Sequence, residues 1–337
     1  MDESTALMQR ALDAARLGPE ADPNPRVGCV VTDSEGTVVG VGHHRGAGTP
    51  HAEVVALEQA GHRARGGTAH VTLEPCDHSG RTGPCTRALL GAGVDRVVYA
   101  VADPDPAAAG GATTLAAAGV RIEPGVLEAD ATELNASWLH ARRTGRPWVV
   151  AKSASTLDGR VAAPDGTSRW ITGEAARADV HRLRARCGAV VVGTGTALTD
   201  DPRLTVRGAD GTDAATQPLR VVVGHRSLPH TARLLDAAAA TLVCATHDVA
   251  RVLADLHARG IHRVLLEGGP TLTAAFLRAG LVDEVVAYVA PVLLGAGPQV
   301  AADLGVTTIS DAVRLRPTDV TVLGVDVRIT ARPLMRS

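Results

Sequence analysis

The 337-residue sequence has few aromatic residues and no excess of charge of one sign. Phe, Trp and Tyr make up 2% of the chain, so few rings are available on which single-stranded bases could stack. The formal net charge is −2, which provides no basic surface of the kind that nucleic-acid binding normally requires. The composition therefore argues against a nucleic-acid partner.

Long apolar runs and an export signal are also missing. No stretch reaches the roughly 18 uninterrupted apolar residues of a membrane span. Residues 1–18 are acidic and interrupted by charges, which predicts an amphipathic helix rather than a signal or transit peptide. The five cysteines are odd in number and widely spread, so a disulfide framework is not expected. We therefore expect a cytoplasmic protein without membrane contact.

The length and the alternation of apolar segments indicate two α/β domains, which we place at residues 1–145 and 146–337 with a linker at 142–147. Hydrophobic residues make up 45% and charged residues 21% of the chain, as in a globular protein. The first domain is expected to contain strands over 27–32, 37–42, 68–73 and 95–102 and helices over 1–18, 51–61, 86–93 and 128–145. The second is expected to contain strands over 147–155, 188–193, 219–224, 240–245 and 262–269, and a closing antiparallel pair formed by 283–294 and 319–330.

The first domain contains a pattern typical of a catalytic zinc site. His51-Ala52-Glu53 opens a predicted helix, and Cys76 and Cys85 flank a loop that leads into another helix. Zinc deaminases of bases bind the metal through one His and two Cys, and a Glu two residues after the His carries protons. Taken singly, these residues could be a surface histidine and buried thiols. Taken together, they predict one zinc ion per chain, held by His51, Cys76 and Cys85, with Glu53 as the proton carrier.

The loop between the two cysteines leaves alternatives open. Eight residues separate them, against two in the C-x-x-C form, and the longer loop is expected to bring His78, Arg81 and Thr82 to the mouth of the pocket, where they would suit a phosphorylated sugar. A deaminase of bases in RNA is disfavoured, because the short spacing, a basic surface and aromatic residues are all missing. A structural zinc module would instead need a fourth ligand, for which Asp77 and His78 are the candidates.

The second domain contains a glycine turn suited to phosphate. Segment 265–277 has the pattern of a strand ending at Glu267, then Gly268-Gly269, then a helix whose first N–H groups could bind a phosphate or pyrophosphate. A tight turn that simply requires glycine is the alternative. Segment 190–200 begins like a dinucleotide-binding fingerprint, but Leu198 stands where the last glycine belongs, so a Rossmann domain is not predicted.

Together the motifs resemble the bifunctional deaminase–reductase family of riboflavin biosynthesis. The first half carries PNPRVGCV (23–30), HRGAGTPHAEV (44–54), TLEPCDHSGRTGPC (72–85) and DPDP (103–106). The second half carries AKSASTLDGRVA (151–162), SRWITG (168–173), VVGTGTALTDDPRLTVR (191–207) and LEGGPTL (266–272). The resemblance implies a cytidine-deaminase-like α/β/α sandwich followed by a dihydrofolate-reductase-like α/β domain.

The resemblance also implies two reactions. The first is zinc-dependent hydrolytic deamination of 2,5-diamino-6-(5-phosphoribosylamino)pyrimidin-4(3H)-one to 5-amino-6-(5-phosphoribosylamino)uracil. The second is NADPH-dependent reduction of the ribosyl group to ribityl. The implied partner is thus a small phosphoribosylated pyrimidine, and self-association of the chain is left open.

Further binding residues follow from the same resemblance. Asn24 and His44 would line the pyrimidine pocket of the first domain. In the second domain the substrate would contact Lys152, Ser168, Arg184, Leu204, Arg207 and Glu267. NADPH would contact Ala154, Trp170, Thr196, Asp200, Gly269, Pro270, Thr271, Leu272, Thr273, Ala274 and Ala275.

Three positions in the first domain depart from the family pattern. Gly83 replaces a usual proline, Asp105 a usual asparagine, and Gly111 stands where the family has a basic residue. If that basic residue helps to hold phosphate, substrate binding would be altered. Gly111 and Asp105 favour one alternative to the main prediction, a biosynthetic paralogue acting on a related modified pyrimidine. The other alternative is a structural zinc module with a degenerate reductase domain, which a fourth ligand in the loop would favour.

Overall fold

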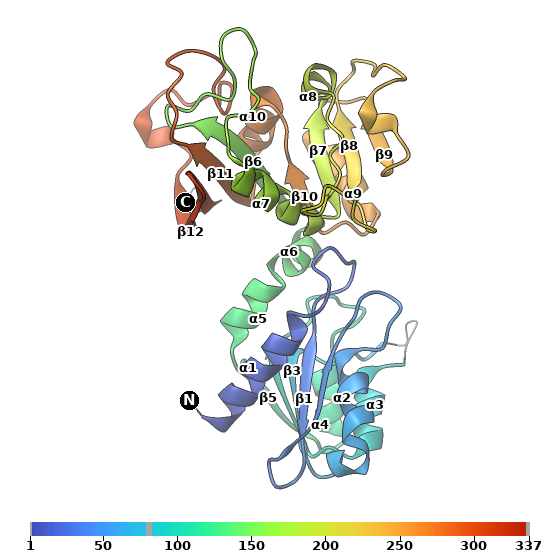
Figure 1. Cartoon of the computed structure of the whole chain (residues 1–337). Helices are drawn as coiled ribbons and strands as arrows, with labels where there is room; N and C mark the ends of the chain where they lie inside the picture. The colour runs from blue at the N-terminus through green and yellow to red at the C-terminus, as the bar shows by residue number, and fades with distance from the viewer. Residues whose placement is uncertain (1, 79–82, 335–337) are drawn as a thin grey trace. The chain divides into compact units, whose positions relative to one another are not determined.

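The computed structural model describes residues 2–78 and 83–334 of the chain. The chain divides into two compact units, Met1–Gly145 and Arg146–Ser337, each with its own sheet (Figure 1). Among the described residues, no helix combines the length and the apolar character needed to cross a membrane.

The first unit is built on a five-stranded mixed sheet in the order β2-β1-β3-β4-β5. β1 is antiparallel to both β2 and β3, whereas β3, β4 and β5 run parallel. The strands are β1 (Gly28–Thr32), β2 (Val38–His43), β3 (Thr68–Leu73), β4 (Arg96–Val101) and β5 (Arg121–Pro124). β5 was not predicted, because its four residues are too few to show an alternating pattern.

Helices cover both faces of this sheet and make three layers. One face carries α1 (Glu3–Ala15), α5 (Glu128–Leu134) and α6 (Ala136–Thr144), which pack with Val30 and Val98. The other carries α2 (Ala52–Ala60), α3 (Cys85–Ala92) and α4 (Gly111–Ala117), which pack with Val31 and Val71, and α2 continues into a 3-10 turn, Gly61–Ala64. Neighbouring valines of one strand thus serve opposite faces, as the two-residue strand period requires.

The single helix expected over 128–145 is wrong, because the structure has two helices that meet at Asn135. The buried Asn135 side chain accepts a hydrogen bond from the Arg26 N–H (2.9 Å) and donates one to the Arg26 carbonyl (2.8 Å). This reciprocal pairing with a distant segment holds Asn135 outside helical geometry, so its cause is tertiary.

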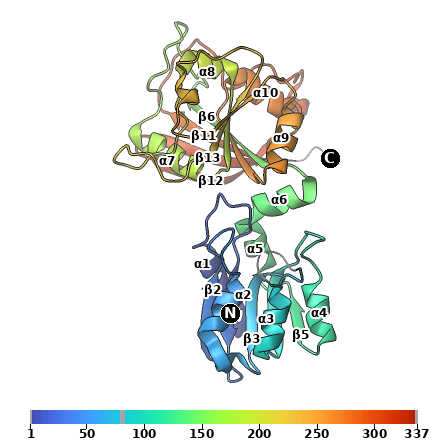
Figure 2. The ribbon, with the colours of Figure 1, turned by 90° about the vertical axis from the view of Figure 1, so that its right-hand side faces the viewer.

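The second unit is built on an eight-stranded sheet in the order β12-β13-β11-β6-β10-β7-β8-β9. The strands are β6 (Trp148–Thr156), β7 (Ala189–Gly193), β8 (Leu219–Val223), β9 (Thr241–Cys244), β10 (Arg263–Leu266), β11 (Glu284–Ala290), β12 (Leu315–Leu323) and β13 (Asp326–Pro333). All neighbours from β11 to β9 are parallel, and β13 and β12 close one side antiparallel. Figure 2 shows β6, β11, β13 and β12 in that succession.

The closing pair differs in one respect from the prediction. β11 does pair antiparallel with the last segment of the chain, through β13. The expected strand over 319–330, however, is a hairpin in which Leu323 of β12 is paired with Asp326 of β13. Gly324, with a φ of 66°, lies in this turn, and the sequence pattern alone does not separate the two short apolar runs.

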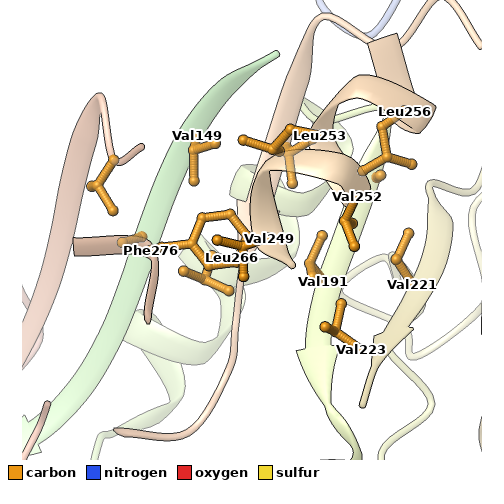
Figure 3. Packing of buried hydrophobic residues seen from close by; sticks show 14 residues of the cluster. Val149, Val191, Val221, Val223, Val249, Val252, Leu253, Leu256, Leu266 and Phe276 are labelled. Atoms are coloured by element: carbon orange, nitrogen blue, oxygen red, sulfur yellow. The ribbon is translucent and has the colours of Figure 1, made fainter. Parts of the chain in front are cut away.

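Helices also cover both faces of the second sheet. On one side α9 (Val249–Ala258) and α10 (Pro270–Arg278) bury Leu253 and Phe276 against valines of β6, β7 and β8 (Figure 3). On the other, α7 (Glu174–Ala185) and α8 (Thr194–Asp200) pack against Val190, Val222 and Leu265. Short 3-10 turns occupy Arg233–Leu235 and Ile309–Asp311.

Candidate functional site

His51, Cys76 and Cys85 meet at the start of two helices of the first unit. His51 is the N-cap of α2, and its side chain makes no capping bond, so the imidazole is free to turn toward a ligand. Cys76 follows β3, and Cys85 is the first residue of α3. The Nδ1 atom of His51 lies 3.2 Å from Cys85 Sγ and 3.5 Å from Cys76 Sγ, and all three donor atoms lie within 4.8 Å of one another.

These separations fit a tetrahedral zinc site. Ligands at the usual Zn–N and Zn–S distances of about 2.0 and 2.3 Å lie about 3.5 Å apart at a tetrahedral angle. Among the described residues, no fourth His, Cys, Asp or Glu joins the group. Asp77 is unsuited, because its two carboxylate oxygens accept hydrogen bonds from Thr86 (2.7 Å) and Thr114 (2.6 Å). Three protein ligands are what a catalytic zinc site has, with the fourth position left for water.

The electrostatics of the group favour thiolate at Cys76. Its pKa is lowered to about 4, first by the hydrogen bond from Cys85 and, against the effect of burial, also by the hydrogen bond from His51. The hydrogen bond between Cys85 and Cys76 raises the pKa of Cys85, and the hydrogen bond between His51 and Cys76 raises the pKa of His51. The backbone N–H of Cys85, at the start of α3, also points at Cys76 Sγ from 3.5 Å.

Glu53 lies in the first turn of α2, beside the three donor atoms. Its side chain is buried, 3% exposed, and burial raises the pKa of its carboxyl group. Glu53, His78 and two of the metal-ligand candidates, His51 and Cys76, line one cavity of about 170 Å³. Gly42 of β2 allows α2 to lie this close to the sheet, since an added Cβ would be 2.2 Å from the carbonyl oxygen of Ala52.

Asn24 and His44 line the same cavity and are joined by a hydrogen bond. His44 Nδ1 lies 3.1 Å from the carbonyl oxygen of Pro50, which can only accept, so this nitrogen carries the proton. His44 Nε2 therefore accepts from the side-chain N–H of Asn24 at 3.0 Å. The carbonyl oxygen of the Asn24 amide is left as an acceptor. Arg81 and Thr82, expected at the mouth of this pocket, lie outside the described residues.

A largely buried ionic group lies at the carboxyl end of β10, beside the middle of β6, in the second unit. Glu267, just after β10, binds Arg184 of α7 through two hydrogen bonds of 2.5 and 2.9 Å, and Lys152 of β6 lies 4.0 Å away. Burial opposes ionisation of Glu267, but the charge and hydrogen bonds of Arg184, with Lys152, lower its pKa overall. Burial lowers the pKa of Lys152. The structure thus brings together three of the predicted substrate residues.

The remaining predicted substrate residues are less closely joined. Arg184 also donates to the Thr205 carbonyl at 3.1 Å, so three of its five N–H donors are used within the protein. The backbone N–H of Arg207 donates to His181 Nδ1 at 3.2 Å, while its exposed guanidinium lies 3.5 Å from Nε2 of the same ring. Leu204 is buried. Among the described residues, no hydrogen bond joins the Ser168 side chain to either arginine.

The residues predicted to contact the dinucleotide lie around the starts of α8 and α10. The hydroxyl of Thr196, in α8, accepts a hydrogen bond from the N–H of Gly269 at 3.1 Å, which joins the two starts. Gly269 is the N-cap of α10 and offers no side chain, so the first N–H groups of the helix stay accessible to phosphate oxygens. The helix then supplies Pro270, Thr271, Leu272, Thr273, Ala274 and Ala275. Ala154 is in β6, Asp200 ends α8, and Trp170, 70% exposed, lies against the Arg177 guanidinium.

Comparisons with known proteins match both units. Residues 1–101 match the family described as the cytidine and deoxycytidylate deaminase zinc-binding region, and residues 147–329 match the RibD C-terminal domain. The riboflavin biosynthesis protein RibD of Mycobacterium tuberculosis is 51% identical over 309 residues, which cover 91% of each chain. That of Escherichia coli is 39% identical over 363 residues, covering 95% of this chain and 96% of the other.

The chain belongs to the RibD family.

Solved RibD structures agree along the whole chain. Acinetobacter baumannii RibD superposes with a TM-score of 0.92 at 40% identity, covering 99% of both chains. The Thermotoga maritima diaminohydroxyphosphoribosylaminopyrimidine deaminase/5-amino-6-(5-phosphoribosylamino)uracil reductase gives 0.89 at 33% identity, covering 98% of this chain and 99% of the other. The predicted fold class is confirmed: a deaminase-like domain precedes a reductase domain. Like other RibD proteins, this chain is a bifunctional deaminase and reductase of riboflavin biosynthesis, with zinc and NADPH as cofactors.

The structure changes how two departures from the RibD pattern are understood. Gly111 does not offer a place for a basic side chain, because an added Cβ would lie 1.8 Å from the carbonyl oxygen of Pro75. Asp105 is not an isolated acid, because it forms an ion pair with Arg142 of α6 at 3.5 Å.

Some residues at the two RibD sites were missed by the sequence prediction. Asp103, Trp138 and Arg142 line the deaminase cavity. The DPDP motif contained a signal for Asp103, but nothing in the local sequence marks the two residues of α6. His181, which contacts Arg207, could have been found from its place three residues before Arg184 on one face of α7.

Proposed function

We propose that the first unit deaminates 2,5-diamino-6-(5-phosphoribosylamino)pyrimidin-4(3H)-one and that the second reduces the product, 5-amino-6-(5-phosphoribosylamino)uracil, at its ribosyl group. The observation that carries the first step is the group of His51, Cys76 and Cys85, whose donor atoms lie close together beside the cavity that the buried Glu53 lines. These three residues would hold zinc. The name borne by the Thermotoga maritima relative supports the choice of substrate.

In the deamination, Glu53 moves the protons. Zinc, when bound, supplies a water molecule of lowered pKa for attack on the amino-bearing carbon. Glu53 takes one proton of that water and passes it to the ring nitrogen. It then takes the proton that remains on the attacking oxygen and gives it to the departing amine, which leaves as ammonia. Its burial beside the donor atoms keeps bulk water from competing in these transfers. Asn24, oriented by His44, presents its carbonyl oxygen to an N–H group of the pyrimidine.

In the reduction, the protein binds and orients the reactants. NADPH, when bound, supplies the hydride, which is added at C1 of the opened ribosylamino group. The N-terminus of α10, with Gly269 and Thr196, would hold the cofactor phosphates. Lys152 of β6 and Glu267, just after β10, lie 4.0 Å apart and would contact the sugar. The exposed guanidinium of Arg207 would bind the substrate phosphate.

We further propose that the enzyme works in the cytoplasm and on small molecules alone. All five cysteines are free, and the ligand thiols need a reducing compartment to stay available for metal. The net charge of −2 supports a role without nucleic acid.

The test is incubation of the zinc-loaded enzyme with the diaminopyrimidinone, with and without NADPH, followed by mass spectrometry. Without NADPH we expect release of ammonia and exchange of one amino group for oxygen. With NADPH we expect a further gain of two hydrogens. An unchanged substrate in both incubations would refute the proposed function.

A further inference from the structure

The cavity of the deaminase unit is strongly acidic for a site that must accept a phosphorylated substrate. Four carboxyl groups line it, from Glu53, Glu74, Asp103 and Asp105, and burial raises the pKa of Glu53 and raises that of Asp103 to about 6. The part of its lining that the structure describes contains one permanently charged cation, Arg142. A cation would stabilise a phosphate dianion near these acids, and within the described lining Arg142 is the residue that can supply one.

Arg142 is held in position but is not saturated with hydrogen bonds. It lies in the last turn of α6, with its guanidinium carbon 5.5 Å from the centre of the Trp138 ring. Its Nη1 atom is 3.5 Å from Asp105 Oδ2, which is longer than the usual 2.7–2.9 Å of a charge-assisted hydrogen bond. Within the described residues, none of its five N–H donors makes a hydrogen bond to the protein. The donors are therefore free for a ligand.

We propose that Arg142 binds the phosphate group of the deaminase substrate. This inference rests on the proposed function. Phosphate offers a guanidinium two parallel hydrogen bonds and two negative charges, whereas Asp105 offers one charge at a longer distance. The Trp138 ring limits the motion of the side chain, so little order has to be created on binding. A cation on α6 thus does what no side chain at Gly111 could do, since that position is closed by Pro75.

The competing explanation is a surface ion pair with Asp105 that has no part in binding. The two explanations differ in what a substrate without phosphate would reveal. If Arg142 binds phosphate, its removal should weaken the binding of the phosphorylated substrate only. If it serves local structure, its removal should affect phosphorylated and dephosphorylated compounds alike, or neither.

The test is the Arg142→Met variant, which keeps the apolar stem over Trp138, measured in the zinc-loaded full-length enzyme by ammonia release. With the phosphorylated substrate we expect KM to rise about 10- to 100-fold and kcat to stay nearly constant, as for loss of a charged hydrogen-bond partner. With the dephosphorylated ribosylamino compound KM should be unchanged. Added NaCl should raise KM for the phosphorylated substrate in the wild type more than in the variant.

Arg143→Met is the matched control. Arg143 is the next residue in the last turn of α6 and is exposed, but it does not line the cavity, so its removal takes the same charge from the same helix end. KM should not change for either compound. Equal KM shifts for both compounds in Arg142→Met, or no shift at all, would overturn the inference while leaving the proposed function intact. A wild-type enzyme that releases no ammonia from the phosphorylated substrate would instead refute the proposed function, and the inference with it.

Discussion

Glu53 is a carboxylate that is only 3% exposed, and it lies beside the three candidate zinc ligands. A buried acid with no structural salt bridge among the described residues is costly to keep, which fits a functional role. Its position two residues after His51 places it in the first turn of α2, next to a ligand at the helix start. The short spacing in sequence is therefore also a short distance in the cavity.

The Glu53→Gln variant should lose deamination and little else. Glutamine has nearly the same shape but cannot carry protons, and loss of general acid–base help lowers kcat by about 10²- to 10⁴-fold. Zinc content, measured by metal analysis, should stay near one per chain, and reduction of deaminated substrate with NADPH should be unchanged. Ammonia release near the wild-type rate from a zinc-loaded variant would show that another group carries the protons.

The Arg207→Ala variant should weaken substrate binding in the reductase unit. The guanidinium of Arg207 is exposed beside His181 and has no carboxylate hydrogen-bond partner among the described residues, which leaves it for the substrate phosphate. We expect KM for 5-amino-6-(5-phosphoribosylamino)uracil to rise about 10-fold or more in NADPH-oxidation assays, with deamination unchanged. Arg203→Ala is the control, because Arg203 in the same loop already pairs with Asp213 at 2.8 Å. Equal effects of both substitutions would remove Arg207 from the binding site.

At the scale of the element, the segment after β3 is fixed by α4. Glu74 accepts hydrogen bonds from the N–H groups of Gly110 (3.3 Å) and Ala112 (3.0 Å), at the start of that helix. Gly111 lies between them and brings the backbone of α4 against Pro75, next to Cys76. The start of α4 therefore supports the position of a metal-ligand candidate.

The Gly111→Ala variant should displace this support. The added Cβ would be 1.8 Å from the Pro75 carbonyl oxygen, and relief of this overlap must move the segment that carries Cys76. We expect the free energy of unfolding to fall by about 1–3 kcal/mol in urea titrations, with weaker retention of zinc against a chelator. Gly91→Ala in α3 is the control, since a Cβ there meets nothing within 4 Å and should stabilise the helix by about 0.5–1 kcal/mol. Wild-type zinc retention in Gly111→Ala would contradict the argument.

The strand β3 also contains a group that makes stability depend on pH. His70 is 3% exposed, its Nε2 lies 3.4 Å from the Ser4 hydroxyl of α1, and Nδ1 has no hydrogen-bond partner within the described residues. Burial, and then the charge of Arg96, lowers the pKa of His70 from its ordinary 6.5 to about 4, although Glu123 acts weakly in the other direction. The folded protein thus favours the neutral ring.

Because the folded pKa of His70 is below the unfolded value, its contribution is complete above pH 6.5 and is lost as the pH falls toward about 4. We expect the free energy of unfolding of the deaminase unit to fall by about 2–3 kcal/mol over this range on account of His70. His70→Gln should flatten that part of the profile in urea titrations at each pH, whereas substitution of the exposed His62 should not. A His70→Gln profile parallel to that of the wild type would show that other groups cause the acid sensitivity.

At the scale of the whole molecule, each unit has its own hydrophobic cores. The two main apolar clusters of the deaminase unit contain only residues of that unit, and the same holds for the two main clusters of the reductase unit. A domain with its own core can in principle fold alone. We therefore expect each unit to fold without the other.

We expect residues 1–145 and 146–337 to be active as separate proteins. The first should bind one zinc and release ammonia, and the second should oxidise NADPH with deaminated substrate, each with cooperative unfolding by circular dichroism. Mixing the two should restore conversion of the diaminopyrimidinone to the ribityl product. A first fragment that is unfolded in the presence of zinc would show that the reductase unit is needed for its stability.

Much of the site could be predicted from the sequence because its chemistry is local. His51 and Glu53 are two residues apart on a helix start, and Cys76 and Cys85 lie at the ends of one loop, so residue type and order indicate the metal and the proton carrier. The strands with clear apolar patterns were likewise predicted. The resemblance to a known family then supplied the substrates and NADPH, which composition and spacing do not reveal.

Other features were decided only by tertiary structure. The helix break at Asn135 depends on hydrogen bonds to Arg26, and segment 315–333 folds as a hairpin in which β13, not β12, is paired with β11. Arg184 pairs with Glu267, 83 residues away, because α7 packs over the strand ends where β10 lies beside β6. Arg142 reaches the deaminase cavity for the same kind of reason: α6 packs on the sheet and brings its last turn to Asp105. Such contacts depend on which surfaces are buried together, and no short stretch of sequence contains that information.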